Sequence, residues 1–213
     1  MLKVKALAYE YARRGARLAL VARREDRLRA VLQEALRLGA PDAIIIPSDV
    51  SNIQHSHRFI QHTINHFGQL DHLVNNAGTN QAKLFEEYST NLSDLAPIMA
   101  SKAAMTMFFE TLRVELGEDI GITIVAPGII ESEMSHKMLT QSEIQTNIRI
   151  PVESREMCAK AIIKSACRGD LYLIEPSWAR IGLWAKWYFP ALVDWCLLKI
   201  VKMPPPHTTK KHN

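Results

Sequence analysis

Helix and strand patterns alternate through the first third of this chain, and the alternation restricts its fold more than any other feature. Apolar residues recur at helical spacing in some segments, and short apolar or β-branched runs of strand length lie between them. Strands that are joined by helices run parallel in one sheet, with helices on both faces. The expected helices are 5–14, 25–38 and 51–67, and the expected strands are 17–22, 43–47 and 70–75. We therefore predict an α/β fold with a Rossmann-like, doubly wound parallel sheet.

The third of these helices has recognisable signals at both ends. The segment from Ser51 to Gln54 has the form of a capping box, with a serine as the cap and a glutamine three residues later. Gly68 is well placed to stop the helix. The sequence therefore predicts a helix that is capped by Ser51 and ended by Gly68.

The pattern weakens between residues 79 and 99 and returns at Ala100. Pro97 would interrupt any long helix in the weak stretch. Beyond it we expect helices at 100–116 and 153–166 and strands at 122–126 and 171–174. Pro127 and Gly128 break the first of these strands, at what would be the ligand edge of the sheet.

The composition is that of a globular protein, with 47% hydrophobic and 23% charged residues among 213. The net charge is +4, and Lys and Arg are spread among nearly as many acids, so we expect no nucleic-acid partner. The three cysteines are widely spaced and match no zinc pattern. We therefore expect no metal site, and a reducing compartment suits the chain.

All four tryptophans lie in one short region near the carboxyl terminus. Charged residues and Pro190 interrupt this region, so it is not a spanning helix of about 20 apolar residues. An aromatic stripe with flanking lysines is typical of a helix in a membrane interface. A terminal helix that covers the core or pairs with a second subunit, as in a homodimer, fits the same pattern. We assign residues 1–176 to a partial Rossmann domain, 177–203 to an aromatic-rich helical segment and 204–213 to a disordered basic tail.

The expected strand at 70–75 ends abruptly in Asn75-Asn76-Ala77-Gly78. Small and polar residues at the carboxyl end of a strand leave backbone groups open where α/β folds bind ligands, although an ordinary turn would have the same residues. Ala100-Ser101-Lys102 opens a helix, and Pro127-Gly128 follows a buried strand. Together these motifs resemble successive landmarks of the short-chain dehydrogenase/reductase family.

Longer segments resemble one group within that family. Residues 9–24, 110–116 and 121–128 are similar to plant hydroxysteroid dehydrogenases of the steroleosin, 11-beta-hydroxysteroid dehydrogenase-like group, and the resemblance covers nearly the whole chain. It implies an NADP-dependent oxidoreductase that interconverts a hydroxyl and a ketone on an apolar, steroid-like substrate. It also implies a protein associated with the membrane of the endoplasmic reticulum or with lipid droplets, facing the cytosol, with a cytoplasmic location as the alternative.

The resemblance also implies which residues bind the cofactor. A basic pair after the strand at 17–22, Arg23-Arg24, suits the extra phosphate of NADP, although a solvated helix start would have the same residues. The other implied positions are Asp49 and Val50 at the adenine, Asn76, Ala77 and Gly78 at the cofactor backbone, Pro127, Gly128 and Ile130 at the nicotinamide, and Ser132 near its carboxamide.

Lys102 is the implied catalytic residue, and a surface charge on a helix is the alternative. In the family a lysine lies one helical turn after a tyrosine, so the ammonium holds the ribose and favours the phenolate. Here Ile98 stands four residues before Lys102 and has no proton to give.

Two further parts of the family pattern are missing from the printed sequence. The interval from Gly78 to Lys102 is too short for the helix, the strand and the catalytic serine that the family places there. No Gly-x-x-x-Gly-x-Gly phosphate loop occurs near the first residues, so the Rossmann sheet is expected to be incomplete. The alternative function is therefore a truncated, catalytically inactive protein that binds at most a lipid, a cofactor or a subunit, and low stability is expected.

Overall fold

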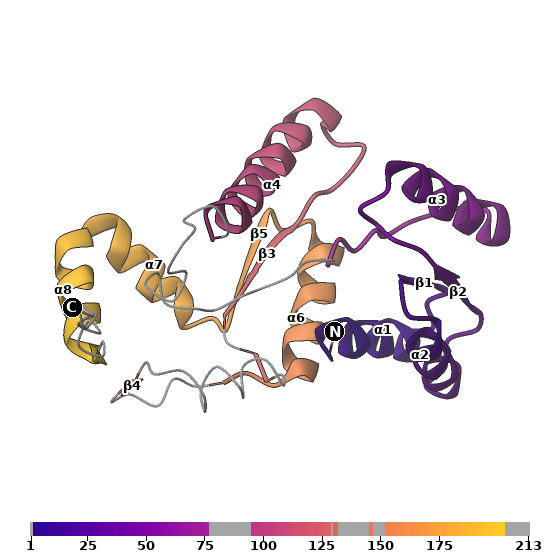
Figure 1. Ribbon diagram of the computed structural model, residues 1–213, viewed down its shortest axis with the longest axis horizontal. Helices are drawn as coiled ribbons and strands as arrows, with labels where there is room; N and C mark the ends of the chain where they lie inside the picture. The colour runs from indigo at the N-terminus through magenta and orange to yellow at the C-terminus, as the bar shows by residue number, and fades with distance from the viewer. Residues whose placement is uncertain (1, 77–94, 129, 132–144, 147–151, 203–213) are drawn as a thin grey trace, which may run out of the picture. The chain divides into compact units, whose positions relative to one another are not determined.

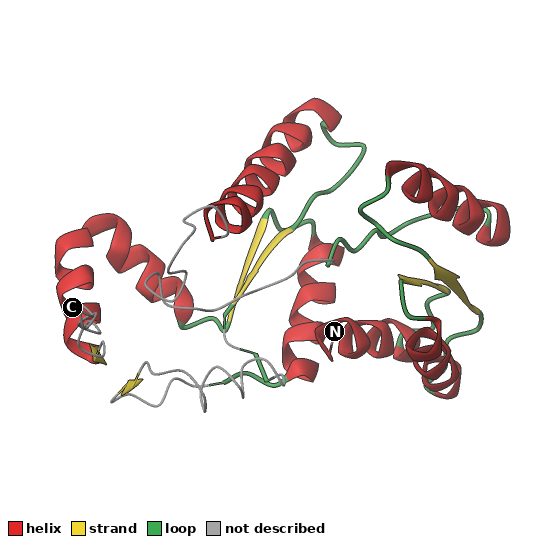
Figure 2. Cartoon of the chain, in the orientation of Figure 1, coloured by secondary structure: helices red, strands yellow, loops and turns green. Residues whose placement is uncertain are grey.

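The computed structural model describes residues 2–76, 95–128, 130–131, 145–146 and 152–202. The chain divides into two compact units. The first holds residues 1–81 and 155–164, and the second holds 82–154 and 165–213. Each unit contains one pair of parallel strands, β1–β2 in the first and β3–β5 in the second (Figures 1 and 2).

The first unit is built on a strand–helix–strand repeat. Helix α1 (Leu2–Arg13) precedes β1 (Leu18–Ala22), and α2 (Glu25–Arg37) connects β1 to the parallel strand β2 (Ala43–Pro47). Small and aliphatic side chains from both helices and β1 form the core, with Ala8, Leu20, Leu28 and Val31 in one cluster. The predicted alternation and parallel pairing are confirmed for these elements.

Helix α3 (Ile53–Phe67) forms as predicted, but its cap is not the predicted residue. Asn52 Oδ1 accepts hydrogen bonds from the backbone N–H groups of Gln54 and His55, at 2.9 and 3.4 Å. Ser51 instead donates its backbone N–H and its hydroxyl to Asp49. The asparagine takes the cap because the serine is already part of the turn after β2. Gly68, with a φ of 84°, ends the helix as expected.

The predicted strand at 70–75 is wrong. Residues 69–76 have no strand geometry, and the side chains of Leu73 and Val74 are 58% and 45% exposed. A strand needs a neighbouring backbone to satisfy its N–H and C=O groups, and in the described part of the first unit only β1 and β2 pair with each other. A hydrogen bond of 2.7 Å between the Tyr11 hydroxyl and His72 Nδ1 connects this segment to α1.

The second unit contains α4 (Leu95–Leu116), β3 (Ile124–Pro127) and β5 (Tyr172–Glu175). The two strands are parallel, with Ile124 beside Tyr172 and Pro127 beside Glu175. Arg113 of α4 donates to the carbonyl oxygens of Ile122 and Leu171, at 3.2 and 2.9 Å. This one side chain therefore fixes the helix to the starts of both strands.

Helix α4 begins five residues earlier than predicted. Pro97 lies in its first turn and does not interrupt it. A proline is tolerated there because the first N–H groups of a helix have no partner within the helix.

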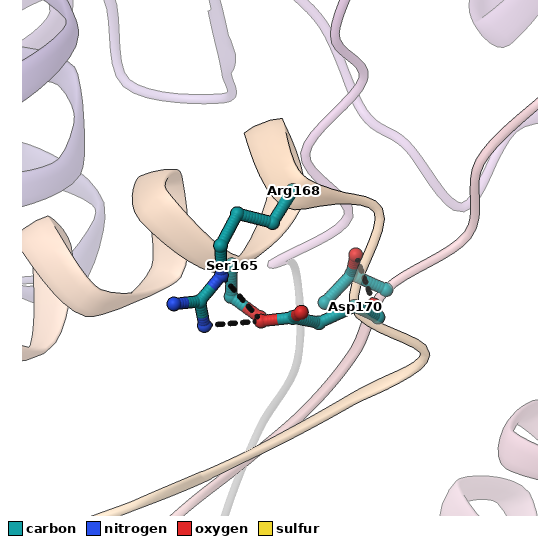
Figure 3. Close-up of polar contacts among 4 residues, drawn as sticks. Ser165, Arg168 and Asp170 are labelled. Atoms are coloured by element: carbon teal, nitrogen blue, oxygen red, sulfur yellow. Dashed lines mark hydrogen bonds and ion pairs between the residues drawn. The ribbon is translucent and has the colours of Figure 1, made fainter.

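Helix α6 (Arg155–Arg168) leads into β5 through a tight polar turn. The Ser165 hydroxyl donates to the carboxylate of Asp170 at 2.8 Å, and the guanidinium of Arg168 donates to the same oxygen (Figure 3). The Thr123 hydroxyl, just before β3, donates to the backbone carbonyl of Asp170 at 2.7 Å. The turn therefore positions the start of β5 beside β3.

Two short helices follow β5. Helix α7 (Ala179–Tyr188) and helix α8 (Pro190–Ile200) are separated at Phe189. The two-residue strands β4 (Gln145–Thr146) and β6 (Val201–Lys202) form an antiparallel pair. Among the described residues, no helix has the length and apolar character needed to cross a bilayer.

Candidate functional site

The carboxyl ends of β1 and β2 form the first group of candidate site residues. The register places Ala22 beside Pro47, and the Ser48 N–H extends the pairing by donating to the Ala22 carbonyl at 3.0 Å. Arg23 follows the end of β1 directly, and Asp49 follows the end of β2 after Ser48. Parallel pairing therefore brings together two predicted site residues that are 26 positions apart in the sequence.

The side chains of Arg23 and Asp49 form a long ion pair of 4.0 Å. Hydrogen bonds from the N–H and hydroxyl of Ser51, with the nearby Arg23 guanidinium, hold the pKa of Asp49 below its ordinary value. The Arg23 side chain is 77% exposed, and Val50 is exposed beside the pair. The group therefore offers an open guanidinium, a carboxylate and an apolar surface at one strand edge.

Arg24 occupies the cap position of α2. Its backbone carbonyl accepts from the Leu28 N–H at 3.2 Å, whereas its side chain makes no cap hydrogen bond. The side chain is exposed and follows directly after Arg23. Both guanidinium groups thus lie at the point where β1 turns into α2.

The remaining predicted residues are not at the ends of β1 and β2. Asn76 is exposed at the end of the irregular segment 69–76. Ala77, Gly78 and Ser132 lie outside the described residues.

The carboxyl ends of β3 and β5 form the second group. Pro127 is the exposed last residue of β3, and the Gly128 N–H donates to the Glu175 carbonyl at 2.6 Å. A Cβ at Gly128 would lie 3.0 Å from Cδ of Pro176 and 3.3 Å from the Glu175 oxygen. The close approach of the two strand ends therefore leaves little space for a side chain at this position. Ile130, only 2% exposed, forms a parallel bridge with Glu153.

Two carboxyl side chains near the ends of β3 and β5, those of Glu153 and Glu175, were not predicted as site residues from the sequence. Burial, the charge of Glu175 and a hydrogen bond with it raise the pKa of Glu153, and the Oε2 atom of Glu153 is buried without a hydrogen-bond partner. Glu175 ends β5, and Glu153 is fixed by the bridge to Ile130. No sequence motif marks this pair, because its members meet only through the pairing of β3 with β5 and the bridge between Ile130 and Glu153.

Lys102 lies on α4 with an exposed side chain. In the part of the chain that the structure describes, no tyrosine hydroxyl is within hydrogen-bonding distance of it. Tyr172 lies at the amino end of β5, opposite the ligand edge, and donates to Glu110. That hydrogen bond and partial burial raise the pKa of Tyr172, whereas an acid/base tyrosine needs a lowered pKa. Tyr172 therefore does not replace the missing phenol.

No cluster of His, Cys, Asp or Glu among the described residues has a geometry that could hold a metal ion.

The sequence pattern of the family described as short chain dehydrogenase matches residues 4–96 and 93–143. These matches cover more than half of the chain. The chain belongs to the short-chain dehydrogenase family. Proteins of this family are oxidoreductases that use a nicotinamide nucleotide, and the predicted family is confirmed.

Plant proteins are similar to this short-chain dehydrogenase over most of its length. The 11-beta-hydroxysteroid dehydrogenase-like 4A of Arabidopsis thaliana is 41% identical over 231 residues, which cover 88% of this chain and 77% of that protein. The 11-beta-hydroxysteroid dehydrogenase A of Arachis hypogaea is 41% identical over 243 residues, which cover 89% of this chain and 69% of that protein.

Solved structures confirm the fold class. A hydroxysteroid dehydrogenase from Escherichia coli superposes with a TM-score of 0.62 at 20% identity, covering 81% of this chain and 90% of that one. A short-chain dehydrogenase/reductase mutant from Serratia marcescens has a TM-score of 0.65 at 22% identity, covering 81% and 91%.

The comparisons also show a gap inside this short-chain dehydrogenase. The two family matches overlap at residues 93–96, so the family pattern is interrupted there. The alignment with the Arabidopsis protein extends over 231 residues, whereas 88% of this chain is about 190 residues. About 40 aligned positions therefore have no residue in this chain. The interruption lies between Gly78 and Lys102, the interval that we expected to be too short for the helix and the strand of the family.

Proposed function

We propose that this short-chain dehydrogenase is an NADP-linked oxidoreductase that interconverts a hydroxyl and a ketone on an apolar, steroid-like substrate. The observation that carries the cofactor choice is the exposed Arg23-Arg24 pair at the carboxyl end of β1. The names of the plant relatives, at about 41% identity, support the substrate class. As part of the same proposal, the expected location is the endoplasmic reticulum or lipid-droplet surface, facing the cytosol.

The chemistry of the donor set fits the 2′-phosphate of NADP. Guanidinium groups bind phosphate oxygens through charge-assisted, often bidentate hydrogen bonds. The 4.0 Å distance from Arg23 to Asp49 is too long for a strong hydrogen bond, so a phosphate can compete with the carboxylate for this guanidinium. We therefore expect the chain to prefer NADP over NAD.

The remaining cofactor contacts in this proposal follow the order of the strand ends. Asp49 and Val50 would contact the adenine, and Lys102 would hold the ribose hydroxyls. Asn76, Ala77 and Gly78 would contact the backbone of the cofactor, and Pro127, Gly128, Ile130 and Ser132 are the positions that the family resemblance implies for the nicotinamide. The bound nicotinamide supplies or accepts a hydride, and this chain's residues bind and orient it.

A second candidate function is binding without turnover. Ile98 stands on α4 four residues before Lys102, where the family has its tyrosine, and about 40 positions of the relatives are absent. A chain without this proton donor would bind NADP, a lipid or a second subunit but would not catalyse the reaction. This candidate predicts NADPH binding that is sensitive to Arg23 and no consumption of NADPH.

The cofactor is tested by titrating the purified full chain with NADPH and NADH and following nucleotide fluorescence. Arg23→Gln should weaken NADPH binding by about tenfold or more, because a charge-assisted hydrogen bond is lost, and should leave NADH binding nearly unchanged. Arg29→Gln is the matched control, since Arg29 is also exposed but pairs with Glu25 within α2. Equal affinities of both variants for NADPH would contradict the proposed phosphate contact.

A measurement of NADPH turnover distinguishes the oxidoreductase from the protein that binds without catalysis. NADPH consumption with a panel of ketosteroids should occur in the wild-type chain and be abolished in Lys102→Ala. Lys160→Ala, at an exposed lysine of α6, should have wild-type activity. NADPH binding without consumption would overturn the oxidoreductase proposal in favour of the second candidate.

A further inference from the structure

The two helices after β5 expose an unusual number of aromatic side chains. Trp184, Trp187 and Tyr188 of α7 are 69%, 86% and 63% exposed. Phe189 and Trp195 beyond them are also exposed. Single exposed apolar residues are normal on a protein, but a contiguous set marks a surface that another molecule covers.

These side chains form a face, not a scattered set. At 3.6 residues per turn, Ile181, Trp184, Trp187 and Tyr188 fall within about one third of the circumference of α7. The Trp184 and Tyr188 rings pack together with centroids 4.5 Å apart. The residues that line a shallow depression on this face are Arg180, Ile181, Trp184, Ala185, Tyr188 and Phe189. We call the following exposed apolar side chains of this segment the aromatic face: those of Ile181, Trp184, Trp187, Tyr188, Phe189 and Trp195.

The positive charge of the chain is concentrated in the same segment. Residues 176–213 contain six Lys or Arg residues and one acid, Asp194, and thus have a net charge of +5. The whole chain has a net charge of +4, so residues 1–175 are slightly acidic. Arg180 lies within the arc of the aromatic face, and Lys186 is exposed on the same helix. The aromatic residues and the excess positive charge therefore lie in the same segment of the sequence.

We propose that the aromatic face docks on the anionic surface of a phospholipid membrane, with α7 and α8 lying in the plane of the interface. Tryptophan and tyrosine rings favour the boundary between headgroups and acyl chains, and basic side chains are attracted to anionic headgroups. Helices of 10 and 11 residues are too short to span the hydrocarbon, which needs about 20. The face would therefore bind to the membrane surface without crossing it. This proposal does not depend on the proposed reaction.

Charge favours lipid over a second copy of the chain as the occupant. Two copies that met through this face would bring two segments of net charge +5 together, and like charges repel. Lysines are depleted in protein–protein interfaces, whereas they are typical of interfacial membrane helices.

The tryptophans provide a built-in probe, because all four lie in residues 178–195. Intrinsic tryptophan fluorescence of the full chain therefore reports on this segment alone. We expect a blue shift on adding vesicles that contain phosphatidylserine in phosphatidylcholine, and co-flotation of the protein with them. Higher salt should weaken both effects, because exposed charges are screened.

Two variants test the two components of the face. Arg180→Gln combined with Lys186→Gln should lower the partition coefficient for anionic vesicles by roughly 25-fold, at about fivefold per basic residue. Trp184→Ser combined with Trp187→Ser should reduce binding to both anionic and neutral vesicles. Val114→Ser on α4 is the control, since Val114 is 82% exposed but lies outside the aromatic face.

Two results would overturn the proposal. One is a chain that stays in the aqueous fraction with unshifted fluorescence at all vesicle concentrations. The other is a blue shift that depends on protein concentration without vesicles and accompanies a dimer in sedimentation, which would assign the face to a second copy. Equal binding to pure phosphatidylcholine would also contradict the role given to the basic residues.

Discussion

Among the described glycines of the second unit, Gly128 has the least space for a side chain. Its N–H is 2.6 Å from the Glu175 carbonyl, and an added Cβ would meet the Pro176 ring at 3.0 Å. Gly128→Ala should therefore destabilise the chain by about 1–3 kcal/mol, the usual cost of overpacking. Urea denaturation followed by circular dichroism measures this. Gly121→Ala is the matched control, because nothing lies within 4 Å of its Cβ, and equal midpoints for the two variants would contradict the strand-end geometry.

Glu153 should make the free energy of unfolding fall as the pH rises, whereas most acidic side chains make it rise. Burial and the neighbouring Glu175 raise the pKa of Glu153 above its ordinary value. At a pH below the pKa of the unfolded chain, this carboxyl is protonated in both states and contributes its full stability to the fold. As the pH rises, the unfolded chain loses the proton first, so the free energy of unfolding falls until the pH has passed the raised pKa of the folded state. The wild-type chain should therefore lose stability relative to Glu153→Gln as the pH rises from about 4 to about 7.

The measurement for Glu153 is a series of urea midpoints across that pH range. Glu156→Gln, at an exposed position of the same region, should keep the wild-type pH dependence. A constant difference between wild type and Glu153→Gln across the range would contradict the raised pKa of Glu153.

At the scale of elements, the turn between α6 and β5 positions the second strand pair. The Ser165 hydroxyl is fully buried and donates to Asp170, whose backbone carbonyl accepts from Thr123 at the start of β3 (Figure 3). Arg168 and Ser165 hold the pKa of Asp170 below its ordinary value. The turn therefore links the end of a helix to the register of two strands through side-chain hydrogen bonds.

Ser165→Ala should destabilise the chain by about 1 kcal/mol, because one buried hydrogen bond is lost. Ser177→Ala, at an exposed serine after β5, should change the midpoint little. Chemical denaturation monitored by circular dichroism distinguishes the two. A wild-type midpoint for Ser165→Ala would mean that the Arg168 contact alone is sufficient for the turn.

At the scale of the whole molecule, the chain buries little for its length. Each unit has one pair of parallel strands among its described residues, and isolated two-stranded pairs are marginal. Large apolar side chains on α4 and on the aromatic face are exposed, Met107, Phe108, Val114 and Trp187 among them. Among the described residues, these side chains thus remain apolar surface that no neighbouring described element covers.

The purified chain in buffer should therefore melt early and gradually, below the range of about 45–65 °C that is typical of mesophilic domains. Thermal melts by circular dichroism and by a hydrophobic dye measure this. Anionic vesicles should raise the midpoint, because a ligand that binds only the folded state stabilises it. A single steep transition well above that range, without vesicles, would contradict this prediction.

Much of the fold could be predicted because it depends on local pattern. The apolar spacing of α1 and α2 and the short runs of β1 and β2 lie within single segments. The same holds for Gly68, the helix-ending glycine with a positive φ. The positions of Arg23 and Asp49 after two parallel strands follow from the same alternation. The family motifs are local as well, and the comparisons confirm the family.

Other features depend on contacts between segments that are distant in the sequence, and the local sequence pattern does not show which segments make these contacts. Leu70–Asn75 has strand composition but forms no strand, because β pairing needs a neighbouring backbone. Asn52 takes the cap from Ser51 because Asp49 already holds the serine.

By itself, the sequence determined the order of α1, β1, α2 and β2, the family and the aromatic, basic carboxyl-terminal segment, since each is a property of neighbouring residues. Only the tertiary structure decided the Glu153–Glu175 pair and the lack of space for a side chain at Gly128, since both arise where β3 and β5 meet. The physical reason is that helix periodicity and capping act over a few residues, whereas strand pairing and burial act between residues far apart in the chain.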